Sequence, residues 1–260
     1  MPSTIDAVLT SWSMDPVVLI GVLVAVVCYL RGWLRLRGRG ADQWGSLQLS
    51  AFVAGNLLLL IALESPLDSF AGLLLQVHML QHLLLTVMVP PLIWYASPGL
   101  PLLVGCPVWL RREWIDPALQ TRWVRRLVDR LVWPPVALAV YVAATWIWHA
   151  PVLYTLALER PAVHIVEHLT FLAAGLLFWY PLLNRGWERH ATVAAGPSAR
   201  WLLIPYLFLA GVQGTVLAGL LTFSERVLYS PYEAAPRLLG ISALDDQAIA
   251  GALMWVVGSL

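Results

Sequence analysis

The chain has 260 residues, of which 60% are hydrophobic and 12% are charged, and its formal net charge is +1. Soluble globular domains are about half apolar and about a quarter charged, so this composition, with a mean hydropathy of +0.75, excludes a soluble domain and predicts an integral membrane protein. The small net charge argues against nucleic acid as a partner.

Seven apolar segments follow one another along the chain, and each approaches the roughly 20 residues that a helix needs to cross a bilayer. They predict an all-α, polytopic membrane protein, a bundle of seven transmembrane helices that forms one domain over residues 1–260. The last segment is short and reaches the end of the chain, as a clipped final helix would. The predicted spans are 16–34, 47–63, 71–95, 132–149, 161–183, 201–222 and 245–260.

All sixteen basic residues are arginine, and their placement predicts an orientation. If the N-terminus is outside, thirteen of them fall in loops on the inner side, which is the asymmetry described by the positive-inside rule. The inner arginines are then Arg31, Arg35, Arg37, Arg39, Arg111, Arg112, Arg122, Arg125, Arg126, Arg130, Arg185, Arg189 and Arg200.

The longest inner loop contains an amphipathic segment at 115–131. Leu119, Trp123 and Leu127 lie on one face of a helix there, and arginines surround them. We interpret this segment as an interfacial helix on the cytoplasmic leaflet, and a solvated linker helix is the alternative.

Five of the six histidines fall in the half of the predicted bundle that faces outward. His78 and His82 in the third span are four residues apart, so they lie on one helix face. His164 and His168 repeat this spacing in the fifth span, and His149 ends the fourth. Imidazoles are costly in hydrocarbon and mark functional sites, and consecutive antiparallel helices pack as neighbours. The sequence therefore permits these five histidines to converge on a buried metal or haem site.

Other candidate ligands share that region. Asp246 opens the last span, and Met254 lies eight residues later on nearly the same face. Glu167 is positioned to fix the tautomer of a neighbouring imidazole. Imidazole with thioether and carboxylate groups suits copper or iron better than magnesium or calcium. Glu64 and Asp68 are interpreted as solvated loop residues.

Several blocks of the chain resemble the membrane-embedded CtaG family, whose members are assembly factors for the caa3-type cytochrome c oxidase of bacteria. The resemblance runs from about residue 47 to residue 260 and respects order and spacing. Its blocks are His78-Met79-Leu80-Gln81-His82 followed by Pro90-Pro91, Trp148-His149-Ala150-Pro151, His164-x-x-Glu167-His168, and Leu244-Asp245-Asp246-Gln247 through Met254.

The resemblance implies a multi-pass, seven-helix protein of the bacterial plasma membrane that helps to mature the oxidase. It implies copper as the metal and an oxidase subunit as the partner, and it leaves open whether a periplasmic copper carrier supplies the metal. The metal ligands that it implies by position are His78, His82, His149, His164, His168, Asp246 and, more weakly, Met254.

The leading hypothesis is a non-enzymatic assembly factor that holds copper on the histidines and passes it on by ligand exchange. A b-type haem protein is the first alternative, because histidines on two helices can be axial ligands, although one of each pair would be unused. A membrane di-metal enzyme, such as a hydroxylase or desaturase, ranks lower, because such sites usually face the cytoplasm and the sequence has no adjacent His-His pair. A proton-coupled transporter would need a relay through Asp246 toward the inner side, where only His190, in a loop, continues it.

Overall fold

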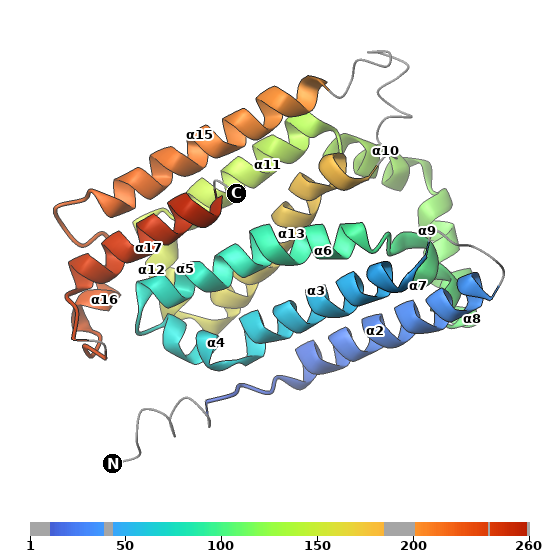
Figure 1. Ribbon diagram of the computed structural model, residues 1–260, viewed down its shortest axis with the longest axis horizontal. Helices are drawn as coiled ribbons and strands as arrows, with labels where there is room; N and C mark the ends of the chain where they lie inside the picture. The colour runs from blue at the N-terminus through green and yellow to red at the C-terminus, as the bar shows by residue number, and fades with distance from the viewer. Residues whose placement is uncertain (1–10, 39–43, 185–200, 239, 259–260) are drawn as a thin grey trace.

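The computed structural model describes residues 11–38, 44–184, 201–238 and 240–258. Within these ranges all regular secondary structure is helical, and the long helices run side by side along the long axis of the molecule (Figure 1). Five residues that the sequence assigns to inner loops lie outside the described ranges: Arg39, Arg185, Arg189, His190 and Arg200. The last two residues of the predicted seventh span are also outside them.

In the described part of the chain, five helices are long and apolar enough to cross a membrane. They are α2 (Pro16–Arg37), α3 (Ser46–Glu64), the continuous run of α5 (Leu75–Leu83), a π-helical turn (Leu84–Met88) and α6 (Val89–Tyr95), α13 (Pro161–Leu183) and α15 (Leu203–Thr222). A sixth is obtained if α10 (Arg122–Leu131) and α11 (Pro134–Trp148) form one broken span, bent by 71°. The sequence predicts seven spans, and the difference is α17 (Ala243–Gly258), whose 16 residues are short for a crossing.

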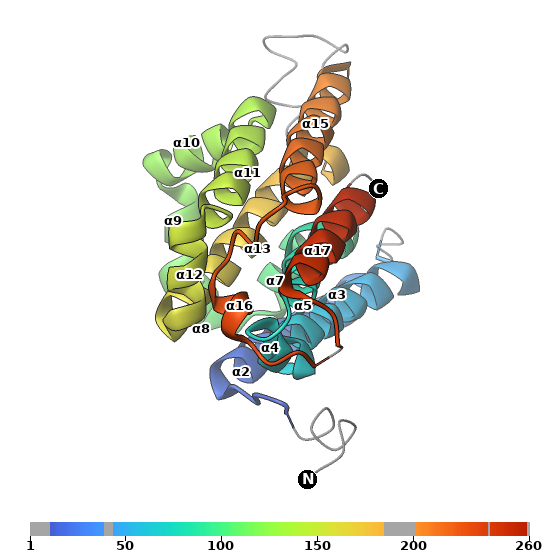
Figure 2. The ribbon, with the colours of Figure 1, turned by 90° about the vertical axis from the view of Figure 1, so that its left-hand side faces the viewer.

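The short helices gather at the two ends of the bundle (Figures 1 and 2). At one end, here called the histidine end, they are α4 (Pro66–Ala71), α12 (Pro151–Glu159) and α16 (Pro231–Ala234). At the other, here called the arginine end, they are α7 (Gly99–Gly105), α8 (Val108–Leu110), a π-helical turn (Arg111–Ile115), α9 (Asp116–Gln120) and α10.

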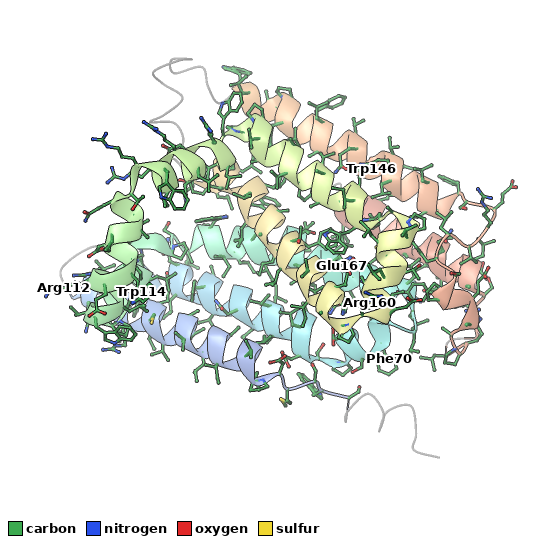
Figure 3. All side chains as sticks on the ribbon, turned by 180° about the vertical axis from the view of Figure 1, so that it is seen from behind. Phe70, Arg112, Trp114, Trp146, Arg160 and Glu167 are labelled. Carbon is green, nitrogen blue, oxygen red and sulfur yellow. The ribbon has the colours of Figure 1, made fainter. Side chains whose placement is uncertain are left out.

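The amphipathic segment predicted over 115–131 is divided in two. Thr121 has an extended backbone (φ −69°, ψ 123°), which ends α9 and begins α10. The apolar side chains Trp123 and Leu127 are 66% and 48% exposed, and Trp114 of the preceding π-helical turn is 67% exposed (Figure 3). The arginine end therefore carries exposed tryptophan and leucine beside its arginines.

A cluster of buried aromatic residues joins α2, α3 and α6 near the arginine end. Tyr29 stacks on Phe52 with ring centroids 3.9 Å apart, and its hydroxyl donates to the carbonyl of Ala96 at 2.8 Å. Nearby, α7 packs directly on the backbone of α2, because a Cβ at Gly105 would lie 1.7 Å from the carbonyl oxygen of Cys28. Only glycine allows this approach, so α7, which follows α6 along the chain, is fixed against α2.

Two further clusters of buried side chains lie toward the histidine end. One contains Leu75, Met79, Tyr154, Leu221, Tyr229, Tyr232 and Ala250, and the other contains Ala62, Leu85, Trp148, Ala157 and Phe171. In contrast, the outward faces of α2 and α15 carry exposed apolar side chains, such as Val17 at 77% and Phe208 at 68%. Helices that are apolar on their outer surface belong in lipid. Polar side chains that are buried in the interior, between these two clusters, are then the ones that need an explanation.

Candidate metal centre

The four histidines of α5 and α13 converge in the interior of the histidine end. Nε2 of His78 lies 2.9 Å from Nε2 of His82. The ring of His78 is 5.3 Å from that of His164, and the ring of His82 is 5.7 Å from that of His168, measured between centroids. Each pair stands on one helix face, as its four-residue spacing predicts, and the two faces are turned toward each other.

Glu167 contributes a carboxylate to the same cluster. Its side chain has no exposed surface, and its oxygens lie 3.7 Å from Nε2 of both His78 and His82. Figure 3 shows Glu167 on α13. Neither oxygen has a hydrogen-bond donor among the described residues. A buried carboxylate needs a compensating positive charge or donors, so this group makes the cluster a strong candidate for holding a cation.

The tautomer of His78 is set by Tyr232, a residue of α16. The Tyr232 hydroxyl donates to the carbonyl of Ala71 at 2.8 Å, so its oxygen accepts from Nδ1–H of His78 at 3.2 Å and from the Tyr154 hydroxyl at 3.1 Å. Burial raises the pKa of Tyr232 above its ordinary value, which keeps the phenol protonated. Nε2 of His78, which faces the other histidines, thereby carries a lone pair, and this lone pair accepts from Nε2–H of His82 at 2.9 Å until a metal takes its place.

The tautomer of His149, which directly follows α11, is also set by a hydrogen bond from Nδ1–H. Its Nδ1–H donates to the carbonyl of Thr145 at 2.7 Å, which leaves Nε2 as the acceptor. That nitrogen is buried and has no partner in the described structure. The ring lies 6.2 Å from Phe171 and 6.5 Å from Tyr154 between centroids, beside the four-histidine cluster rather than within it.

Several buried polar atoms at this site lack a hydrogen-bond partner among the residues that are described. They are Nδ1 of His82, Nε2 of His149, His164 and His168, and both carboxylate oxygens of Glu167. Buried polar groups in native proteins are almost always paired. Apart from the nitrogen of His149, which lies beside the cluster, these imidazole and carboxylate groups belong to one cluster and have the donor chemistry of a site for copper or a similar transition metal.

Three overlapping groups of side chains have ligand atoms that all lie within 4.8 Å of one another. They are His78, His82 and His168, then Asp68, His164 and His168, and then His78, His164 and Glu167. Because the groups share members, an ion bound by one has ligands of the next within reach.

Asp246 and Met254 lie outside these three groups. The Asp246 carboxylate accepts from the backbone N–H groups of Leu75 and Gln76 at 2.7 and 3.1 Å, so it caps the first turn of α5. Met254 packs against the buried cluster around Tyr154. Asp246 thus positions the helix that carries His78 and His82, which is a structural contribution to the site.

The π-helical turn after His82 is held against α13 by a hydrogen bond to a carbonyl that a proline leaves free. Pro90 has no N–H, so the carbonyl of Thr86, four residues earlier, accepts instead from Nε1 of Trp179 at 3.0 Å. A Cβ at Gly175 would lie 2.9 Å from Cα of Thr86, so glycine permits this contact. The Thr86 hydroxyl donates to the carbonyl of His82 at 2.7 Å. These bonds set the distance between the two histidine-bearing helices.

The interpretation of Glu64 and Asp68 as solvated loop residues is wrong. Glu64 is 3% exposed, and it accepts from the backbone N–H of Asp15 at 2.6 Å. Asp68 is half-buried and accepts from Nε2 of Gln81 at 2.9 Å. Glu64 ends α3 at the histidine end, and α4, which packs against α5, brings Asp68 over the cluster. This packing is tertiary, so the local sequence around these two residues does not predict it.

Sequence reasoning gave Glu167 only a supporting role and did not find Tyr232. The signal for Glu167 was its position three residues after His164, which places it on the same helix face. Tyr232 is 154 residues from His78, and the local sequence gives no signal for this pairing.

The family described as "Cytochrome c oxidase caa3 assembly factor (Caa3_CtaG)" matches residues 27–260, which include all the residues of this site. An uncharacterized protein of Mycobacterium bovis, Mb0105, is 25% identical over 272 residues, and the alignment covers 100% of this chain and 39% of that protein. The uncharacterized protein ML1998 of Mycobacterium leprae is 23% identical, with coverage of 98% and 38%.

The chain thus spans about two-fifths of the length of the curated relatives that it matches. No solved structure matches it significantly. The family match extends over nearly the whole chain and contains the histidine blocks in α5, α11 and α13. The chain therefore belongs to the family of caa3 cytochrome c oxidase assembly factors, the CtaG family.

Proposed function

We propose that this protein binds a copper ion on the histidine cluster and delivers it to a subunit of the oxidase during assembly. The observation that carries the proposal is the convergence of four histidines with a buried, unpaired Glu167 carboxylate. Imidazole and carboxylate donors of this kind suit copper. Membership in a family of oxidase assembly factors supports delivery to the oxidase as the use of the ion.

Transfer would proceed by ligand exchange. One imidazole nitrogen leaves the copper ion as a ligand of the oxidase subunit binds it, and the oxidation state of the metal does not change. Because the three ligand groups overlap, the ion can lose one bond while two others hold it. Cargo transfer of this kind forms no chemical product, so the protein acts as a carrier and not as an enzyme.

We place the protein in the bacterial plasma membrane as a seven-helix bundle with its N-terminus and histidine end outside. The arginine asymmetry supports this orientation through the positive-inside rule. An outward site would receive copper from the periplasmic side, directly or from a soluble carrier. The short helix α17 completes the count of seven if the bilayer is thinned at its end.

The contacts of the rings favour copper over haem. The imidazoles of His78 and His164 approach to 5.3 Å between centroids, and those of His164 and His168 to 4.0 Å. Axial haem ligands must instead stand on opposite sides of a flat macrocycle, which these packed rings leave no room for.

The test is the metal content of the purified full chain after loading with copper and desalting. The parent is expected to retain copper. His78→Ala/His168→Ala is expected to lose it, because the two substitutions remove at least one ligand from each of the three ligand groups. His190→Ala, a histidine outside the described structure, is the matched control and should retain copper. A parent that retains none after any loading protocol contradicts the proposal, and a Soret absorption band would instead favour haem.

The proposed function can also be tested in cells by measuring the copper content of the oxidase. In a strain that lacks the chromosomal copy, the parent and His190→Ala should restore a copper-loaded oxidase, whereas the double variant should leave apo-oxidase. Immunoblots would establish that all three proteins reach the membrane in similar amounts.

A further inference from the structure

A cavity opens beside the histidine cluster between the start of α2, α4 and the start of α13. Its volume is about 280 Å³. Its rim carries exposed side chains, with Ile165 at 56% and Leu169 at 61%, whereas His168 in its wall is 8% exposed. Nε2 of His168 has no partner among the described residues. The cavity therefore leads from the surface of the bundle to a histidine of the cluster.

The charge of the cavity wall is negative. Asp15, Glu64 and Asp68 line it, and the described lining residues include no arginine. Carboxylates in a recess of low dielectric raise the local concentration of cations and the rate at which they bind. Two of the three already have backbone partners, since Glu64 accepts from Asp15 N–H and Asp15 caps α2 by accepting from Val17 N–H at 2.7 Å.

Asp68 is placed to act as a ligand. One of its ligand oxygens lies within 4.8 Å of a ring nitrogen of both His164 and His168. Gln81 holds the carboxylate through a hydrogen bond from Nε2, which also donates to the carbonyl of Ala62 at 2.8 Å. The half-buried Asp68 is thus fixed over the opening of the cluster by a fully buried amide.

We propose that this cavity is the port through which a copper ion reaches the cluster, and that Asp68, His164 and His168 form a first binding station. His168 also belongs to the group with His78 and His82. The ion would move inward when the bond from Asp68 is replaced by one from His78 or His82 while His168 stays bound. No electron is transferred, and no other reactant is needed. This inference rests on the proposed function.

The test measures the rate of copper uptake separately from its extent. The purified full chain is mixed with the Cu(II)–glycine complex in a stopped-flow instrument, because mixed imidazole and carboxylate donors suit Cu(II). Asp68→Asn keeps the shape of the side chain and an acceptor for Gln81, but removes the charge. The second-order rate constant should fall about tenfold. The final copper content should be unchanged.

Two further variants sharpen the result. Glu225→Gln removes an exposed carboxylate elsewhere in the described chain and should take up copper at the parental rate. Val18→Trp fills the cavity from α2 without touching a ligand and should slow uptake while leaving the final content intact.

The outcomes separate the two proposals. A parent that binds copper together with an Asp68→Asn variant that takes it up at the parental rate overturns the port and leaves the proposed function standing. A variant with parental rate but reduced final content also overturns it, because Asp68 would then belong to the final site. A parent that binds no copper overturns the proposed function itself.

Discussion

At the scale of single residues, the carboxyl group of Glu167 distinguishes this cluster from a group of packed neutral histidines. A carboxylate without exposed surface or hydrogen-bond donors is costly in a bilayer. A bound cation removes that cost and gains the attraction of the negative charge. Four imidazoles alone would offer ligands, and Glu167 adds the electrostatic term that favours an ion over an empty site.

Glu167→Gln tests this electrostatic term while preserving the volume of the side chain. The dissociation constant for copper, measured by competition with a chelator, should rise about 10- to 100-fold. Each factor of ten is about 1.4 kcal/mol, so the stabilisation of the protein by saturating copper should shrink by that amount. Glu233→Gln, at an exposed residue of α16, is the control. Unchanged affinity in Glu167→Gln would contradict a role of the carboxylate in holding the ion.

The histidines could be found from the sequence because helical spacing and predicted depth are local properties. His78 and His82, like His164 and His168, needed only their four-residue separation and an apolar context. Asp246 was predicted as a ligand from its place at the start of the last span and from the family resemblance, and in the structure its oxygens accept from the backbone of α5. The partners of a buried polar side chain depend on tertiary packing, so ligand and cap are indistinguishable before the fold is known.

At the scale of elements, the site depends on how closely α13 approaches the α5–α6 run. The π-helical turn and Pro90 free the Thr86 carbonyl, and Trp179 satisfies it. π-helical turns inside α-helices are frequent at functional sites, and here the turn follows directly after the helix that carries His78 and His82. Thr86 lies about one helical turn after His82, whereas its partners Gly175 and Trp179 lie about two and three turns after His168 on α13.

Trp179→Phe should destabilise the protein by about 1–3 kcal/mol, because it leaves the Thr86 carbonyl buried and unpaired. Trp94→Phe is a matched control. Trp94 Nε1 donates to the carbonyl of Leu176 at 2.8 Å, but that carbonyl lies inside α13 and keeps its intrahelical bond. Thermal unfolding in detergent measures both variants. Equal losses of stability would mean that the carbonyl freed by Pro90 is not what Trp179 stabilises.

The hydropathy of the sequence predicted where the long helices lie, but it did not predict where they are interrupted. The segment 71–95 reads as one apolar stretch, whereas the structure begins α5 only at Leu75, after α4 has ended at Ala71. The reason is a tertiary one, since the free N–H groups of Leu75 and Gln76 are capped by Asp246 from α17. Likewise, nothing in the composition of 115–131 marks Thr121 as the residue where α9 ends.

At the scale of the whole molecule, the two ends of the bundle differ in chemistry. The histidine end contains the cluster, Asp68, Glu64 and the acidic N-terminus of α17, whereas α8 to α10 carry arginines and exposed tryptophans at the opposite end (Figures 1 and 3). Anionic lipids and the positive-inside rule favour arginines on the cytoplasmic side. Sequence alone supports this polarity well, because it needs only the order of loops and spans.

The orientation is tested by labelling single cysteines in intact cells. Cys28→Ser/Cys106→Ser removes the two native thiols, and Ser230→Cys and Leu119→Cys then place one thiol at an exposed residue of each end. With the histidine end outside, a membrane-impermeant maleimide should label Ser230→Cys in whole cells and Leu119→Cys only after permeabilisation. The reverse pattern would put the cavity beside Asp68 in the cytoplasm. Copper would then have to be drawn from cytoplasmic carriers, and delivery to an oxidase subunit from the outer face would no longer be possible without transport across the bundle.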